Sequence, residues 1–119
     1  MLTKLLSNAI VTWATRYPAI LRVWLYGSRV KGTARPDSDL DVAVEIHSHE
    51  FRGQAPYLWW MFESKAMKAS LSEVLSPVKL DMQQYEQSAL EVLTGVADHG
   101  ILLYGPPIQE PGVKAIAET

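Results

Sequence analysis

The chain contains no cysteine. Disulfide scaffolds, cysteine-ligated zinc, iron–sulfur clusters and cysteine nucleophiles are therefore excluded as classes. Long apolar runs are also missing: polar Ser7 and Asn8 follow the apolar start too early for a secretory signal, and no segment is long enough to span a membrane. These absences predict a cytoplasmic protein.

An excess of charge of one sign is missing as well. The chain has 11 Lys and Arg side chains against 13 Asp and Glu, which gives a formal net charge of −2. A protein that binds nucleic acid in general presents a strong positive excess to the phosphates. We therefore expect no general nucleic-acid binding.

The apolar content that is present suits one domain. Hydrophobic residues make up 48% of the 119 residues, enough for a single core. Apolar spacing predicts helices over 3–16, 54–75 and 84–97 and a short helix between 27 and 36, and apolar runs predict strands over 20–26, 39–46, 78–82 and 101–104. This order indicates a small α/β (α+β) fold over 1–104, a mixed sheet of about four strands with helices packed on it. Prolines and glycines concentrate after 104, so 105–119 is expected to be an irregular tail.

Acidic residues interrupt two of the predicted strands. Asp39 and Asp41 lie two positions apart, so both carboxylates project from the same face of the strand. Like charges this close cost stability unless a cation lies between them, and a divalent cation with oxygen ligands is the usual compensation. A third carboxylate, Asp81, lies in the next predicted strand, and if the two strands are neighbours the three carboxylates converge, as a pair of magnesium ions requires. The alternative for each is a carboxylate that faces solvent.

The turn after the first predicted strand has the composition of a phosphate site. Gly27 lets the backbone approach a ligand closely, Ser28 supplies a hydroxyl and Arg29 supplies a positive charge. A helix that begins here would direct N–H groups at an anion. The sequence therefore predicts a phosphate cradle opposite the carboxylates.

Two other ligand motifs fail on the same stretch. A calcium-binding loop that starts at Asp37 would need glycine and glutamate where Val42 and Ser48 stand. A P-loop that starts at Gly27 would need lysine where Thr33 stands.

His47, His49 and Glu50 form a weaker candidate metal site. The remaining histidine, His99, is distant in the sequence. A solvated loop is the interpretation we favour for these three residues.

The segment from Leu25 to Val42, LYGSRVKGTARPDSDLDV, resembles the signature of the nucleotidyltransferase superfamily related to DNA polymerase β, in its minimal branch. The similarity extends over residues 20–104 and implies the polymerase β-like nucleotidyltransferase fold, with transfer of a nucleoside monophosphate, AMP from ATP, to an acceptor hydroxyl. The resemblance implies catalytic and metal-binding roles for Asp39, Asp41 and Asp81, with two Mg²⁺ ions, or Mn²⁺ in their place. It also implies that the nucleotide is bound by Gly27, Ser28, Arg29 and Ser38.

The resemblance also implies a partner. Family members of this size lack the acceptor-binding domain of larger relatives and are often encoded with a small helical HEPN toxin, so we predict an antitoxin that adenylylates and neutralises a HEPN-type protein. One alternative is a non-catalytic module that masks the toxin, although a binder needs no set of three mutually repelling acids. Another is a small-molecule transferase of the aminoglycoside type, whose acceptor pocket would have to form across a homo-oligomer.

An aromatic cluster lies in the longest predicted helix. Tyr57, Trp59, Trp60 and Phe62 are too closely spaced to face one core. Core packing explains part of the cluster, and the remainder is either a wall of the nucleotide pocket or a protein-binding surface. If part of the cluster is an interface, we expect two of the four side chains to be exposed in the isolated chain.

Overall fold

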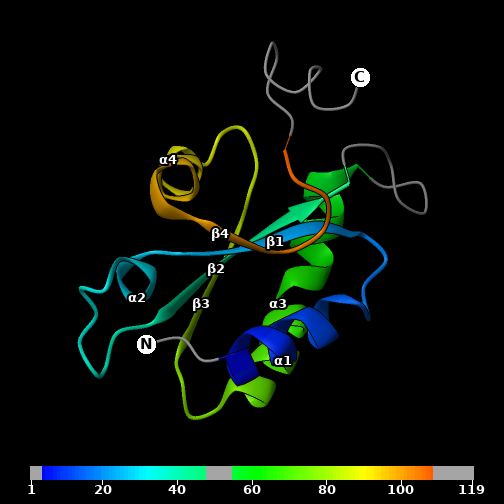
Figure 1. The fold of residues 1–119 in the computed structure, drawn as a ribbon. Helices are drawn as coiled ribbons and strands as arrows, with labels where there is room; N and C mark the ends of the chain where they lie inside the picture. Colours follow the sequence, from blue (N-terminus) through cyan, green and yellow to red (C-terminus); the bar gives the residue numbers. More distant parts are fainter. Residues whose placement is uncertain (1–3, 48–54, 109–119) are drawn as a thin grey trace.

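The computed structural model describes residues 4–47 and 55–108. Helices and strands alternate along the chain (Figure 1). Their bounds are α1 Lys4–Ala14, β1 Ile20–Tyr26, α2 Ser28–Lys31, β2 Leu40–Ile46, α3 Pro56–Leu75, β3 Leu80–Gln84, α4 Leu90–His99 and β4 Ile101–Tyr104. The predicted order of elements and the mixed α/β fold class are confirmed.

One four-stranded sheet has the order β3-β2-β1-β4. Strand β1 is antiparallel to both of its neighbours, whereas β2 and β3 run parallel, joined through α3. Parallel neighbours need such a crossover because their ends are far apart. The pairing of β2 with β3 brings two of the acidic segments side by side.

The sheet separates a large core from a small one. On one face α1 and α3 pack over Leu40, Val42 and Val44 of β2, while α4 covers the other face, where Ala43 packs with Trp24 and Val92. Side chains of a strand alternate between faces, so Asp41 shares the α4 face with Ala43. Because the apolar side chains of β2 face the large core, the Asp41 carboxylate lies on the side of the smaller core.

Helix α3 is fixed to α1 by buried apolar and polar contacts. Met67 and Leu71 are buried in the large core, and the Trp13 indole Nε1 donates a hydrogen bond to Ser70 Oγ at 2.9 Å. A buried indole N–H needs such a partner. The two helices thereby form one layer against the sheet.

The sequence misplaced the region from 78 to 90. The third strand is Leu80–Gln84 and the following helix begins at Leu90, so a helix start at residue 84 is wrong. Gln84 pairs with Val44, and the Tyr85 N–H donates to the Val44 carbonyl at 2.8 Å, which extends the strand. The Ser88 N–H then donates to the Glu86 carboxylate at 3.0 Å, a local turn that delays the helix.

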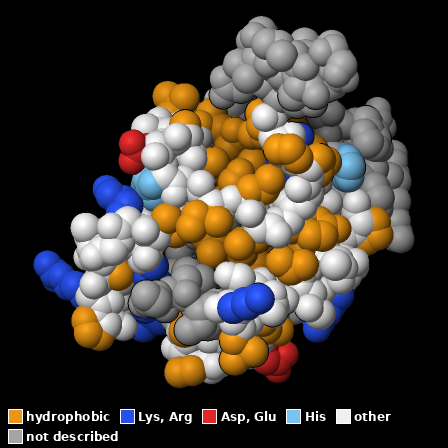
Figure 2. Space-filling view, in the orientation of Figure 1, with side chains coloured by type: hydrophobic (Ala, Val, Ile, Leu, Met, Phe, Trp, Pro, Cys, Tyr) orange, Lys and Arg blue, Asp and Glu red, His pale blue; other side chains and the backbone are white. Residues whose placement is uncertain are grey.

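Strand β4 forms one edge of the sheet. Figure 2 shows hydrophobic side chains gathered across the middle of the face that carries β4, and Ile101 is 49% exposed. An edge strand keeps backbone groups unpaired on its outer side, so this edge is partly open and apolar.

Beyond β4, residues 105–108 form neither helix nor strand, and 109–119 lie outside the described residues. The predicted domain boundary at 104 stays a prediction. Within the part of the chain that the structure describes, no helix is long and apolar enough to cross a membrane.

Candidate active site

Three polar residues form a row across the sheet on the α4 face. Asp41 of β2 pairs directly with Asp81 of the parallel strand β3. On its other side Asp41 pairs with Tyr26, the last residue of β1. Residues paired across neighbouring strands point to the same face, so the two carboxylates and the phenol lie together. We call these three residues the acidic row.

The carboxylates of this row repel each other. Burial, followed by the charge of Asp81 and a hydrogen bond to Asp81, raises the pKa of Asp41 from 3.8 to about 6. Burial, followed by the charges of Asp41 and Asp81, raises the pKa of Tyr26 to about 12. Both shifts have the same origin, negative charge concentrated in a partly buried place. A cation bound here would relieve that repulsion.

Asp39 stands at the rim of this row. It is exposed, precedes the first residue of β2, and its charge contributes to the raised pKa of Asp41. No group of three His, Cys, Asp or Glu side chains among the described residues is arranged to hold a metal ion. The structure thus brings Asp41 and Asp81 together and leaves Asp39 beside them.

Gly27 forms the turn between β1 and α2. Its φ of 85° lies in the left-handed region, and a Cβ at this position would overlap the Asp41 carboxylate oxygen Oδ2. Its carbonyl accepts hydrogen bonds from the N–H groups of Val30 and Lys31, both at 3.1 Å. Only glycine permits this approach of backbone to carboxylate, so the predicted phosphate turn lies directly against the acidic row.

Ser28, Arg29 and Ser38 lie around this turn in different ways. Ser28 is the first residue of α2 and is half-buried. The Arg29 guanidinium donates to the Ser38 carbonyl from Nε at 3.0 Å and from Nη2 at 2.7 Å. The Ser38 hydroxyl accepts from the Arg35 N–H at 2.8 Å. Arg29 and Ser38 therefore hold the loop that leads to Asp39.

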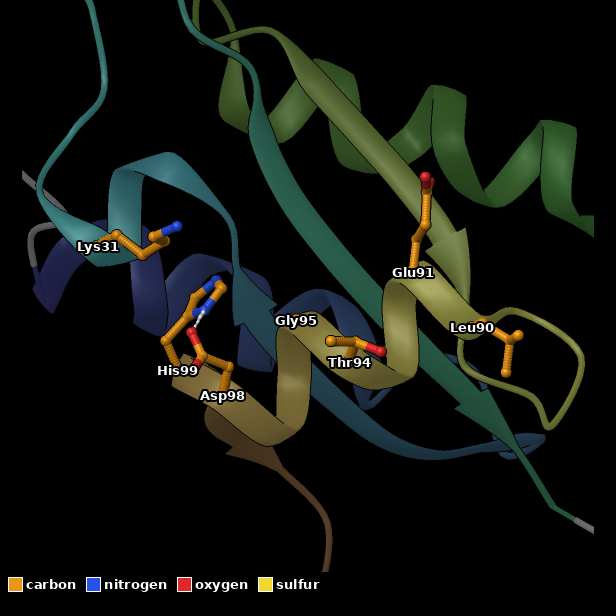
Figure 3. Close-up of a pocket in the computed structure, with 7 residues that line it drawn as sticks. All are labelled: Lys31, Leu90, Glu91, Thr94, Gly95, Asp98 and His99. Atoms are coloured by element: carbon orange, nitrogen blue, oxygen red, sulfur yellow. Dashed lines mark hydrogen bonds and ion pairs between the residues drawn. The ribbon is translucent and has the colours of Figure 1, made fainter.

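A cavity of about 480 Å³ opens beside the row, between α2 and α4 (Figure 3). A Cβ added to Gly95 would come within 2.9 Å of Tyr26 Cδ2, which places the wall of the cavity against the row. Its lining is Lys31, Leu90, Glu91, Thr94, Gly95, Asp98 and His99.

Helix α4 adds site residues that sequence reasoning missed. The sequence suggested His99 only as a distant partner for His47. In the structure, His99 Nε2 accepts a hydrogen bond from the Gly27 N–H at 2.7 Å. Glu91 of α4 also lies near the row, since its charge adds to the raised pKa of Tyr26. No local pattern marks these residues, because the chain positions they join are far apart.

The remaining candidates lie away from this site. His47 is half-buried after β2, while His49 and Glu50 lie outside the described residues. Trp59 is 8% exposed and belongs to the large core, whereas Tyr57 is 61% and Phe62 65% exposed. The expectation that two of the four aromatic side chains are exposed is confirmed.

Comparison with known proteins supplies a family and a fold. A family model described as polymerase beta, nucleotidyltransferase matches residues 8–107. No curated protein sequence is significantly similar to the chain.

Solved structures with the same fold include toxin–antitoxin complexes. A chain of a toxin–antitoxin crystallised with AMP-PNP is 20% identical, with a TM-score of 0.64 over 84% of this chain and 73% of that one. A chain from the tri-AMPylated Shewanella oneidensis HEPN toxin in complex with MNT antitoxin is 17% identical, with a TM-score of 0.60 over 87% and 72% of the two chains. At this identity the likeness concerns the fold.

Proposed function

The chain belongs to the polymerase beta nucleotidyltransferase family, and on that premise we propose that it transfers AMP from ATP to a hydroxyl of a protein partner. One observation carries the proposal: Asp41 and Asp81 are paired side by side against the glycine turn that begins α2. In the reaction the acceptor oxygen bonds to the α-phosphorus while the bond from that phosphorus to the pyrophosphate oxygen breaks. The hydroxyl proton leaves the acceptor, and pyrophosphate is released.

The acidic row suits divalent cations. Carboxylate oxygens are the ligands that Mg²⁺ and Mn²⁺ prefer, and burial, followed by the charge of Asp81, raises the pKa of Asp41. We propose that Asp39, Asp41 and Asp81 hold two Mg²⁺ ions, with Mn²⁺ as a substitute. When bound, such ions lower the pKa of the attacking hydroxyl and neutralise the leaving oxygens.

Different residues around the acidic row bind different parts of the substrate. The turn at Gly27 and the Ser28 hydroxyl hold the triphosphate, and Arg29 with Ser38 fixes the loop that presents Asp39. The cavity between α2 and α4 borders the same row and offers space for the nucleoside. We assign the proton of the acceptor hydroxyl to Asp81, which is paired with Asp41.

The acceptor belongs to another molecule. This proposal is supported by a chain of the same fold that occurs in the complex of a tri-AMPylated HEPN toxin with MNT antitoxin. We propose that the partner is a small helical HEPN-type toxin, that its tyrosine hydroxyl receives AMP, and that the modification neutralises it.

Co-expression with a small helical HEPN-type protein tests the proposal. Mass spectrometry of the purified partner is expected to show AMP adducts with the wild-type chain and none with Asp39→Asn/Asp41→Asn. Asp37→Asn, an exposed aspartate of the same loop, is the matched control and is expected to leave the adducts in place. An unmodified partner that still binds the wild-type chain would replace this function with a masking role.

A further inference from the structure

The last residue of α4 is bonded to the turn at Gly27. The Gly27 N–H donates to His99 Nε2 at 2.7 Å, across 72 positions of sequence. The His99 side chain is 17% exposed, so little water competes for this bond. The contact joins the helix over the small core to the turn in front of the acidic row.

The same bond sets the tautomer of His99. A neutral imidazole carries one N–H, and because Nε2 accepts from Gly27 the hydrogen lies on Nδ1. That N–H faces the Asp98 carboxylate, with Nδ1 and Oδ2 2.9 Å apart (Figure 3). The hydrogen bond from His99 in turn lowers the pKa of Asp98. Asp98, His99 and the Gly27 peptide thus form one chain of hydrogen bonds.

His99 is not needed to end its own helix. The Gly100 N–H donates to the Val96 carbonyl at 2.8 Å and closes α4 through the backbone. The ring nitrogen is therefore directed to the turn rather than to a helix cap. Its role has to be sought at Gly27.

Gly27 needs a partner that fixes its peptide. Glycine reaches many backbone conformations, and at a φ of 85° and ψ of −166° this one leaves no room for a Cβ, which would overlap the Asp41 carboxylate oxygen Oδ2. A rotation of this peptide would move the start of α2 and the carboxylate relative to each other. The hydrogen bond from the Gly27 N–H to His99 restrains this rotation.

We propose that His99, oriented by Asp98, is a positioning residue for the nucleotide-binding turn. Its Nε2 fixes the Gly27 peptide, and through it the alignment of the triphosphate-binding turn with Asp41. This inference rests on the proposed function, because it assigns the turn to ATP.

Two substitutions separate the hydrogen bond from the bulk of the ring. His99→Phe keeps an aromatic ring without an acceptor and is expected to weaken ATP binding in the presence of Mg²⁺ by about tenfold, the effect of one lost hydrogen bond. His99→Gln offers a carbonyl oxygen at a similar reach and is expected to recover most of that affinity. Titration calorimetry with ATP and Mg²⁺, well below the melting temperature of each variant, measures both.

Nuclear magnetic resonance provides a reading without nucleotide. Coupling across the hydrogen bond, between the Gly27 amide nitrogen and His99 Nε2, is expected in the wild type, and its absence would overturn the inference. Equal ATP affinity in the wild type and in His99→Phe would overturn the inference alone. A wild-type chain that fails to bind ATP with Mg²⁺ would overturn the proposed function and the role of His99 together.

Discussion

Asp41 is a charged residue in a strand whose neighbouring residues are buried in the large core. Its neighbours Leu40 and Val42 are fully buried and fix β2 against the large core, which forces the carboxylate toward Asp81 on the other face. Burial and the second carboxylate raise the pKa of Asp41 to about 6. The position is therefore unfavourable for an isolated anion and favourable for a cation site.

The first prediction concerns the stability of Asp41→Asn in metal-free buffer. The folded-state pKa of about 6 lies above the ordinary value of 3.8, so the wild type binds the Asp41 proton more tightly when folded. That stabilisation is complete below pH 3.8 and is lost as the pH rises through 6. Asparagine does not ionise, so the variant is expected to gain about 1 kcal/mol relative to the wild type at pH 7, a value reduced for solvent screening.

Thermal unfolding from pH 4 to pH 7 in the presence of a chelator measures this difference. The melting temperatures of the wild type and Asp41→Asn should diverge as the pH rises. A melting-temperature difference that stays constant over this pH range would show that the pKa of Asp41 is not raised in the folded chain.

The second prediction concerns Gly27. Gly27→Val places a β-branched side chain on the Asp41 carboxylate and is expected to abolish ATP binding in the presence of Mg²⁺. Ser28→Ala removes one hydroxyl and is expected to cost about 1 kcal/mol, a several-fold change in Kd. Titration calorimetry compares the two variants.

Gly32→Val is the matched control for backbone strain. Gly32 also has a positive φ, 81°, but a Cβ there meets nothing within 4 Å. At a ψ of 15° Gly32 lies in the left-handed helical region, which is less restricted than the ψ of −166° at Gly27. Gly32→Val therefore carries backbone strain without the overlap and is expected to keep more of the ATP affinity. Equal loss in both variants would mean that strain, and not the contact with Asp41, explains the effect.

At the scale of single elements, α3 stands apart because it is apolar on more than one side. Met67, Leu71 and Leu75 face the large core. Tyr57, Met61 and Phe62 are 61%, 66% and 65% exposed. Exposed apolar side chains gathered at one end of a helix are typical of a protein interface.

The third prediction assigns this end of α3 to the helical partner. Tyr57→Ala/Phe62→Ala is expected to weaken binding of the co-expressed partner by about 2 kcal/mol or more, roughly thirtyfold in Kd. ATP binding with Mg²⁺ should survive, because the acidic row lies on the other face of the sheet. Leu5→Ala, at an exposed leucine of α1, is the control, and an unchanged partner affinity in the double variant would exclude this surface.

At the scale of the whole molecule, the sheet is what assembles the site. Tyr26, Asp41 and Asp81 come from β1, β2 and β3, and the cavity wall comes from α4. Each contribution depends on the pairing of strands that the large core holds in register. Binding at this site should therefore stabilise the chain as a unit.

The fourth prediction is a shift in the global melting temperature. ATP with Mg²⁺ at about one hundred times its Kd is expected to stabilise the wild type by about 2.7 kcal/mol, which corresponds to several degrees. Asp39→Asn/Asp41→Asn should lose this shift and Asp37→Asn should keep it. Differential scanning calorimetry measures all three, and a full shift in the double variant would exclude these carboxylates as metal ligands.

The sequence by itself determined the features that depend on neighbouring residues. β1 was predicted at Ile20–Tyr26 as observed, because an apolar run ended by glycine is a local signal. The two-residue period of a strand predicts a shared face for Asp39 and Asp41, and because β2 begins at Leu40 this stays a prediction for Asp39. The Gly27 turn and the resemblance of its segment to nucleotidyltransferases were likewise present in consecutive residues.

The tertiary structure alone decided which distant residues meet. Whether Asp81 lies beside Asp41 depends on β3 joining β2 in parallel after α3, and whether His99 reaches Gly27 depends on how α4 packs on the sheet. The same pairing extended β3 to Gln84 and moved the start of α4 to Leu90. These outcomes follow because both faces of the sheet must be buried at the same time. The free energy of that burial comes from segments far apart in the chain, so no local sequence pattern indicates it.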